Sequence, residues 1–249
     1  MLKKERQALI LKQVNLHNRI FSTQLCEEIR VSEDTIRRDL LELASEGKII
    51  KVHGGALSCS FAINNWNQDE VYSSDKKKTI AAKAAALIED GMFVLTSGGT
   101  TIIELAKALP PDLKATFVCG SLPVLLEYMN HPNIEVIVVG DKLSKSARIT
   151  SGSQAIEQVR SIKADLCFLG INAIDLAWGL TDNEWEVVLL KKAMVESARK
   201  VVGLTISEKI NTCQPLSIGP VEDLDYLVTE LPPGDALLEP YANKGITII

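Results

Sequence analysis

Apolar residues recur at helical spacing through the first part of the chain, residues 1–58. A first helix is predicted by four apolar residues that share one face: Leu2, Leu9, Ile10 and Val14. The following segment predicts a second helix, which Ser22 can cap and which turns Leu25 and Ile29 inward. We therefore expect a small helical domain at this end of the chain.

A third helix is predicted to begin after Ser32, whose side chain can cap it. Its first turn carries Glu33 and Asp34, and negative charges are favourable at the positive end of a helix. Gly47 is in the usual position for a helix stop. The buried stripe of this helix is predicted to consist of Ile36, Leu40, Leu43 and Ala44.

The exposed side of the third helix is polar and cationic near its start. Arg38 is expected to point away from the apolar stripe, with Thr35 and Arg37 on the flanks. An arginine pair on a helix is usually only a solvated face. Here the pair lies in a capped helix-turn-helix pattern, which favours a recognition helix that meets base edges and phosphates.

A strand and a tight turn follow this helix directly, in the sequence KIIKVHGGALS. Residues 48–53 are predicted to form the strand and Gly54-Gly55 the turn, which together make a wing. Lys51 and His53 can reach a phosphate from there. The residues predicted to contact DNA are therefore Ser32, Thr35, Arg37, Arg38, Lys51, His53 and Gly54.

Residues 59–75 read as a linker, because they lack periodicity and are rich in Ser, Asn and Asp. The linker contains three large aromatic residues, Phe61, Trp66 and Tyr72, which are too many for a fully solvated tether. We expect them to pack on the larger domain, and contact with a partner subunit is the alternative.

The remainder, residues 76–249, alternates apolar strands with helical runs, which predicts an α/β domain with a mostly parallel sheet. Helices are expected over 76–89 and 100–109. Strands are expected over 92–96, 115–119, 134–140, 164–171, 200–204 and 224–230. The predicted fold class is thus α/β, with a small winged helix-turn-helix domain in front of a larger effector domain.

The strongest chemical signal in this domain is the junction between the strand 92–96 and the helix after it. It contains Ser97, Gly98, Gly99, Thr100 and Thr101. Glycines let the backbone approach a phosphate, and the helix dipole favours the anion. The junction also follows the carboxyl end of a strand, where open α/β sheets bind ligands. A plain capped turn is the alternative. The motif is not GxGxxG, so a dinucleotide is disfavoured.

Other strand ends and loops are expected to converge on the same crevice. Lys145 and Arg148 follow the strand 134–140 and can neutralise a phosphate. The remaining candidates for binding the effector are Ser121, Gly152, Gly170 and Lys209. Each of these residues, taken alone, also fits an ordinary surface loop.

Charge is distributed unevenly over a chain whose net charge is -5. Residues 1–58 contain 10 Lys and Arg against 8 Asp and Glu, a net +2, which leaves 17 against 24, a net -7, for residues 59–249. A mildly basic domain beside an acidic one suits a regulator whose second domain avoids phosphates of DNA. The five cysteines form no CxxC pair, and no metal or cofactor is expected. Neither a signal peptide nor a membrane span is predicted, so we expect a cytoplasmic protein.

The motif TIRRDL followed by HGGA resembles the DeoR-type repressors of sugar metabolism. In that family the segment that corresponds to residues 20–39 is the helix-turn-helix unit. The resemblance continues in KKKTIAAKAA, SGGTT, GSLPV, Gly152, residues 179–181 and the lysine of SEK. It implies an effector domain that is similar in fold to ribose-5-phosphate isomerase and binds a phosphorylated sugar or related metabolite.

The leading hypothesis is a transcriptional repressor that binds a double-stranded DNA operator as a homo-oligomer and responds to a phosphorylated sugar-like effector. The second is an isomerase-like enzyme, for which Lys209, Asp141 and Glu184 are the conceivable acid–base groups. Two of the three histidines lie in the first domain, and His131 lies in a loop remote from the presumed pocket. The third is an architectural protein that binds no ligand. We favour the repressor and expect no enzymatic activity.

Overall fold

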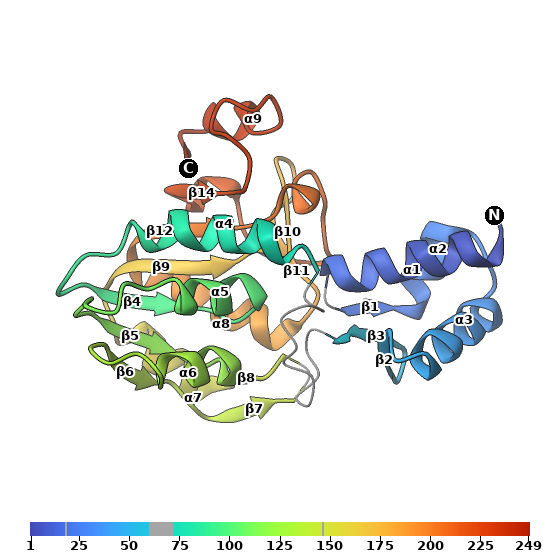
Figure 1. Ribbon diagram of the computed structural model, residues 1–249, viewed down its shortest axis with the longest axis horizontal. Coiled ribbons are helices and arrows are strands. Elements are labelled where there is room, and N and C mark those ends of the chain that lie inside the picture. The colour runs from blue at the N-terminus through green and yellow to red at the C-terminus, as the bar shows by residue number, and fades with distance from the viewer. Residues whose placement is uncertain (18, 60–71, 146) are drawn as a thin grey trace. The chain divides into compact units, whose positions relative to one another are not determined.

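The computed structural model describes residues 1–17, 19–59, 72–145 and 147–249, and it divides into two compact units (Figure 1). We call Met1–Ser74 the head and Asp75–Ile249 the body. The predictions for Phe61 and Trp66 lie outside the described residues, whereas Tyr72 is described and half-buried.

Within its described residues, the head contains three helices and a three-stranded antiparallel sheet, in the strand order β1-β3-β2. Its elements are α1 (Lys3–His17), β1 (Arg19–Phe21), α2 (Ser22–Ile29), α3 (Glu33–Ser45), β2 (Ile49–Val52) and β3 (Gly55–Ser58). The core is formed by apolar side chains from every one of these elements: Ile10, Val14, Ile20, Leu25, Ile29, Ile36, Leu40, Leu43, Ile49 and Ala56. This is the predicted winged helix-turn-helix.

The helices of the head differ from the prediction in three places. Leu2 precedes α1 and is 72% exposed, so it does not belong to the buried face. Ser22 does not cap α2, because β1 runs straight into the helix and Phe21 takes the cap position. The backbone N–H of Ser22 instead donates to the carbonyl of Gly54 at 2.8 Å. In α3, Ala44 is only half-buried.

The tight turn of the wing consists of His53 and Gly54, one residue earlier than predicted. Val52 pairs with Gly55 across the hairpin, and Gly54 adopts a φ of 75°, which favours glycine. Gly55 belongs to β3, where a Cβ atom would lie 2.0 Å from the carbonyl oxygen of Ile20. The second glycine is therefore required by the close approach of β1, not by the turn.

The body is built on a seven-stranded sheet with the order β15-β14-β12-β9-β4-β5-β6, in which every pair is parallel. Its strands are β4 (Phe93–Thr96), β5 (Thr116–Cys119), β6 (Glu135–Val138), β9 (Ala164–Gly170), β12 (Ala198–Leu204), β14 (Tyr226–Val228) and β15 (Thr247–Ile248). The predicted α/β class and the mostly parallel sheet are confirmed.

Helices lie on both faces of this sheet. In Figure 1, α4 (Ser74–Ala85), α5 (Thr100–Lys107) and α6 (Leu122–Tyr128) lie in front of the sheet, and α7 (Ser153–Arg160) and α8 (Trp185–Glu196) lie behind it. The helix predicted over 76–89 begins earlier and ends at Ala85, and the sequence had not predicted α6, α7 or α8. The short α9 (Glu239–Ala242) precedes the last strand.

Two antiparallel additions complete the body, and neither was predicted. A side sheet combines β10 (Ala173–Asp175), β11 (Gly179–Asp182) and β13 (Leu216–Gly219). A hairpin pairs β7 (Lys142–Ser144) with β8 (Ile149–Ser151). Two short 3-10 helices, η3 (Ser207–Lys209) and η4 (Val221–Asp223), follow β12 and β13.

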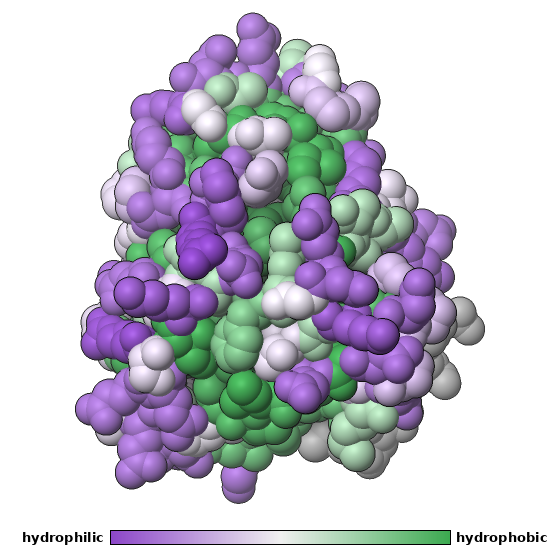
Figure 2. All heavy atoms as spheres, turned by 90° about the vertical axis from the view of Figure 1, so that its left-hand side faces the viewer, coloured by the Kyte–Doolittle hydropathy of each residue, from purple (hydrophilic) through white to green (hydrophobic). Residues whose placement is uncertain are grey.

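The surface of the body is mixed. Figure 2 views it from the side on which the strands of the large sheet begin, and hydrophilic side chains surround areas of apolar ones. Large apolar side chains are exposed on α6, at its C-cap and on the edge strand β6, including Leu126 at 53%, Met129 at 79% and Val138 at 56%. Across the described ranges, no helix combines the length and the apolar character needed to span a bilayer.

Candidate DNA-binding surface and candidate anion site

The start of α3 is fixed by the side chain of Ser32. Its hydroxyl accepts a hydrogen bond from the backbone N–H of Thr35 at 3.4 Å and lies 2.9 Å from the hydroxyl of Thr35. This is the predicted N-cap, and it satisfies one of the N–H groups that a helix leaves without an internal partner. Both hydroxyls are therefore engaged in holding the helix end.

Arg37 and Arg38 both project into solvent, with side chains that are 61% and 78% exposed. Their guanidinium groups lie 3.1 and 3.5 Å from the carboxylate of Asp34 in the same helix. Such exposed ion pairs contribute about 0–1 kcal/mol to stability. The arginines can thus exchange Asp34 for a phosphate at little cost.

Lys51, His53 and Gly54 lie on the wing and are all exposed. Lys51 is in β2, while His53 and Gly54 form the turn between β2 and β3. The structure therefore places all seven predicted DNA-contacting residues at the start of α3 or on the wing.

A buried ion pair that the sequence reasoning missed holds α3 against α1. Asp39 is 1% exposed, and both of its carboxylate oxygens accept hydrogen bonds from the guanidinium of Arg6, with Gln7 as a further donor. The hydrogen bond from Arg6 to Asp39 raises the pKa of Arg6. The signal was present in the sequence, since Ile36, Asp39 and Leu40 recur at helical spacing and a buried acid needs a partner.

In the body, the junction between β4 and α5 combines tight backbone contacts with a helix start. Ser97 is fully buried, and its hydroxyl accepts from the backbone N–H of Gly170 at 2.9 Å. A Cβ at Gly170 would lie 2.8 Å from the carbonyl oxygen of Gly98, and one at Gly98 would lie 3.1 Å from the hydroxyl of Ser121. Four predicted site residues are therefore in direct contact.

The first turn of α5 has the properties of an anion site. Gly99 precedes the helix with a φ of 116°, and it makes no side-chain cap. A Cβ at Gly99 would meet nothing within 4 Å. Thr100 and Thr101 begin the helix and are buried. Because the first N–H groups of a helix lack internal partners and carry positive partial charge, this turn is suited to bind an anion.

Two buried lysines supply positive charge at this end of the sheet. Lys209, at the end of η3, is 9% exposed and donates to the carbonyl of Ile171 at 3.3 Å. Burial, and next the positive charge of Lys77, lower the pKa of Lys209 to about 7. Lys77, on α4, is 4% exposed, and burial lowers its pKa to about 8. Carboxylates already favour the charged forms, Glu104 and Glu208 for Lys77 and Asp182 and Glu208 for Lys209, but burial outweighs them. An added anion would stabilise both cationic forms further.

Lys77 was missed as a site residue. It was read only as part of a helix, although it shares a helical stripe with the buried residues Ile80, Ala81 and Ala84. A lysine in such a stripe is a signal that sequence reasoning could have used.

Lys191 on α8 is a third buried lysine near the same strand ends, and it was also missed. Its ammonium donates to the carbonyl of Gly170 at 2.8 Å and to Asp182 at 2.7 Å. Burial alone would raise the pKa of Asp182, but Lys191 and neighbouring hydrogen bonds bring it below its ordinary value. Lys191 is thus neutralised by Asp182 and supports the backbone of Gly170.

Arg148 lies beside the residues around Ser97, because its carbonyl accepts from the backbone N–H of Leu122 at 2.9 Å and the next residue, Ile149, pairs with Ser121. Lys145 and Gly152 are in different surroundings. Lys145 is exposed between β7 and β8, and Arg148 is half-buried with a φ of 53°. Gly152 precedes α7, and a Cβ there would lie 2.3 Å from the carboxylate of Asp141. That carboxylate accepts from the backbone N–H of Gln154 at 3.1 Å. The start of α7 already binds the carboxylate of Asp141. A glycine is needed at position 152 because that carboxylate leaves no room for a Cβ atom.

A winged helix-turn-helix joined to an α/β body with a candidate anion site is the arrangement of a DNA-binding regulator with a sensor domain. Comparison with known families agrees with this class. The DeoR-like helix-turn-helix domain matches residues 6–61, and the DeoR C terminal sensor domain matches residues 73–231. The chain therefore belongs to the DeoR family of transcriptional regulators.

Similar proteins extend over the whole chain. The HTH-type transcriptional repressor GlcR of Bacillus subtilis (strain 168) is 29% identical and aligns over 100% of this chain and 96% of its own. The glycerol-3-phosphate regulon repressor of Escherichia coli (strain K12) is 27% identical over 100% and 99%, respectively. Ribose 5 phosphate isomerase A from Neisseria gonorrhoeae aligns over 53% of this chain and 52% of its own, with 16% identity and a TM-score of 0.40.

Proposed function

We propose that this protein is a transcriptional repressor of carbohydrate metabolism genes that binds an operator through α3 and the wing, and that a phosphorylated sugar or related metabolite controls it. The observation that carries the proposal is the pair of buried lysines, Lys77 and Lys209, at the end of the sheet where α5 begins. Two desolvated cations beside a helix start favour a doubly charged phosphate over a neutral sugar.

The printed names of the two relatives support this proposal. Both are repressors, and one is named for the regulon of a phosphorylated polyol, glycerol 3-phosphate. We carry over only the class of ligand, which is a small phosphate monoester.

The DNA-binding half is tested with an operator selected by the full-length protein from a randomised duplex pool. Replacing Arg38 with alanine should weaken binding at least tenfold and lower the salt slope by about 1, because one phosphate or base contact is lost. Lys12→Ala is the matched control, since it removes one exposed positive charge outside α3 and the wing. Equal losses in the two variants, or no loss in either, would show that α3 is placed wrongly.

The ligand-binding half is tested by thermal denaturation of the full-length protein. Ribose 5-phosphate, glycerol 3-phosphate and inorganic phosphate are compared with ribose and glycerol at equal ionic strength. A phosphorylated compound should raise the apparent stability, since it binds the native state. Thr100→Ala and Lys209→Met should abolish the increase, whereas the exposed Lys114→Met should keep it. The proposal fails if no anion stabilises the wild-type protein.

We further propose that the protein binds its operator as a homodimer, because paired recognition helices match repeated half-sites. The exposed apolar side chains of α6 and β6 are the proposed contact, since β6 is an edge strand whose free backbone groups can pair with a second copy. Mass measurement in solution should give a dimer for the wild type and a monomer for Val138→Lys. A Val138→Lys variant that remains dimeric would place the interface elsewhere.

The isomerase-like alternative is addressed by the same geometry. Asp141 is engaged at the start of α7, and His131 is bonded to the carbonyl of Pro110 at 2.7 Å. Glu184 is half-buried in the cap position before α8. Lys209 is the acid–base candidate that belongs to the proposed anion site. An assay with ribose 5-phosphate should show no turnover; turnover at an ordinary enzymatic rate that disappears in Lys209→Met would establish an enzyme instead.

A further inference from the structure

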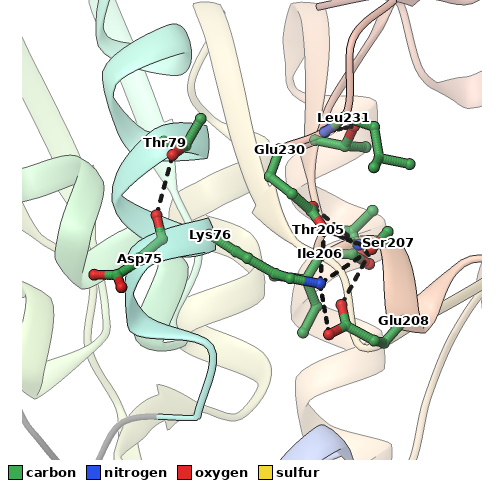
Figure 3. A network of polar contacts seen from close by, with 10 residues as sticks. Asp75, Lys76, Thr79, Thr205, Ile206, Ser207, Glu208, Glu230 and Leu231 are labelled. Atoms are coloured by element: carbon green, nitrogen blue, oxygen red, sulfur yellow. Dashed lines mark hydrogen bonds and ion pairs between the residues drawn. The ribbon is translucent and has the colours of Figure 1, made fainter. Parts of the chain in front are cut away.

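Lys76, at the start of α4, reaches across to two loops that follow strands of the large sheet (Figure 3). Its ammonium lies 2.6 Å from the carboxylate of Glu208 in η3 and 3.1 Å from that of Glu230, and it donates to the hydroxyl of Ser207 at 3.4 Å. Glu230 also accepts from the backbone N–H of Ser207 at 3.0 Å. We call Lys76, Ser207, Glu208 and Glu230 the clasp.

The clasp lies next in sequence to the proposed anion site on both of its segments. Lys76 precedes Lys77 on α4, and Glu208 precedes Lys209 on η3. One pair of neighbours, Lys76 and Glu208, is oppositely charged and in contact. The other pair, Lys77 and Lys209, is cationic and buried. Each segment thus contributes to the clasp and also carries a buried lysine, and the positive charge of Lys77 disfavours the charged form of Lys209.

An anion between the two segments changes this balance of charge. The buried ammonium groups of Lys77 and Lys209 already interact with carboxylates, and a bound anion would add an attraction to both. Occupancy of the site should therefore fix the first turn of α4 more firmly against η3. The ion pairs and the hydrogen bond of Lys76 transmit this effect, because they connect the first turn of α4 to the loops that contain Glu208 and Glu230.

The first turn of α4 is also the point at which the chain enters the body. The helix begins at Ser74 and the boundary between the two units lies between Ser74 and Asp75. Lys76 is therefore within two residues of the boundary between the head and the body.

We propose that the clasp couples occupancy of the anion site to the head, with Lys76 as a positioning residue that transmits binding without touching the ligand. This inference rests on the proposed function, since it requires an anion at Lys77 and Lys209. A ligand changes DNA affinity only if it binds one state of the protein more tightly than another. We assign that difference between states to the contacts of the clasp.

A purely structural role for the clasp predicts something different. The side chains of Lys76, Glu208 and Glu230 are 38%, 27% and 11% exposed. If the clasp only stabilised the fold, its loss would lower the melting temperature and leave the response to ligand intact. If it transmits binding, its loss would leave binding intact and remove the response.

The test measures two quantities in the full-length protein, with ribose 5-phosphate and inorganic phosphate as probes. The first is the affinity for each probe, by calorimetry. The second is the ratio of operator affinities with and without a saturating probe. Lys76→Met breaks the clasp, Lys76→Arg preserves the charge and the donors, and Lys78→Met is the matched control two positions along the same helix. Lys78 lies 3.9 Å from Asp75 and does not belong to the clasp.

For wild type, Lys76→Arg and Lys78→Met, we expect the bound probe to change operator affinity about tenfold, a typical size for coupling between sites. For Lys76→Met we expect probe affinity within about threefold of wild type and a change in operator affinity below about twofold. If Lys76→Met binds the probe and retains the full change, the clasp does not transmit binding and the inference is wrong. If no variant, wild type included, binds either probe, the proposed function fails and the clasp loses its role with it.

If Lys76→Met fails to fold, Glu230→Gln gives the same test, because it removes one charge of the clasp while keeping an acceptor for Ser207. The same two measurements then decide, with the expected and contradicting outcomes unchanged.

Discussion

Replacing Lys209 with methionine should stabilise the protein while abolishing its response to phosphate. Methionine has a similar length and no charge, so it removes the buried cation and keeps most of the packing. The pKa of Lys209 falls from 10.5 to about 7 in the folded protein, chiefly because the ammonium is buried. The charged form is therefore disfavoured by folding, and the substitution removes that cost.

The size of the effect depends on pH in a defined direction. Between pH 7 and pH 10.5 the unfolded chain binds more protons at this lysine than the folded protein does, so the wild type gains stability as pH rises through that range. Each unit of pKa difference corresponds to about 1.36 kcal/mol. The buried Lys209 therefore lowers the free energy of unfolding by about 5 kcal/mol at pH 6 and by about 2 kcal/mol at pH 9. The substitution also removes the hydrogen bond to Ile171, which reduces the gain in free energy of unfolding by about 1–3 kcal/mol at either pH.

The pH dependence is the quantity to measure, because the hydrogen bond and the packing contribute equally at both pH values. The advantage of Lys209→Met over wild type in free energy of unfolding should shrink by about 3 kcal/mol from pH 6 to pH 9. For the transition of the body this is roughly 6–12 °C in melting temperature. Calorimetry of the full-length proteins measures it, with Lys114→Met as a control for loss of an exposed lysine.

The result that refutes this reasoning is an advantage that is the same at pH 6 and pH 9, or a variant that is less stable than wild type at pH 6 but not at pH 9. Either would mean that the ammonium of Lys209 is well compensated in the folded protein. An anion would then gain little by binding beside it, and the case for a phosphate site would weaken accordingly.

Three further predictions concern the contacts that shape the two units. Asp39→Asn should destabilise the head by roughly 2–4 kcal/mol, because it removes the buried partner of Arg6, and chemical denaturation of the full-length protein should show the loss in its first transition. Gly55→Ala should cost the head more than about 3 kcal/mol through its clash with β1, whereas Gly54→Ala should cost only about 1–2 kcal/mol through its positive φ; similar losses in denaturation midpoints would show that the turn rather than the strand contact is critical. Ser97→Ala should destabilise the body by about 1–3 kcal/mol by leaving the backbone N–H of Gly170 without its partner, and an unchanged melting temperature would contradict this.

The head was largely predictable because its signals are local. The cap at Ser32 and the periodicity of Ile36, Leu40 and Leu43 are each set by neighbours a few residues away, and the structure reproduces them. The error at Ser22 arose because a short strand, β1, takes the place of the loop that a cap would need. Strand pairing joins residues far apart in sequence, so no local pattern announced it.

In the body, the alternation of apolar runs determined a parallel α/β sheet, and the glycines of SGGTT indicated a helix start suited to an anion. The side sheet of β10, β11 and β13 was beyond local reasoning, since its strands are short and one partner lies some 35 residues away. The same limit applies to Gly152, whose neighbour Asp141 comes from another loop.

By itself, the sequence determined the capped start of α3, most of its buried stripe and the glycine-rich turn that precedes α5. Only the tertiary structure decided which charges meet. Arg6 and Asp39 are 33 residues apart, and Lys76 and Glu208 are 132 apart. Helical periodicity predicts that a lysine is buried, whereas the packing of distant segments determines which residue it contacts. The electrostatic environment of Lys77 and Lys209, on which the proposed response to ligand depends, exists only in the folded body.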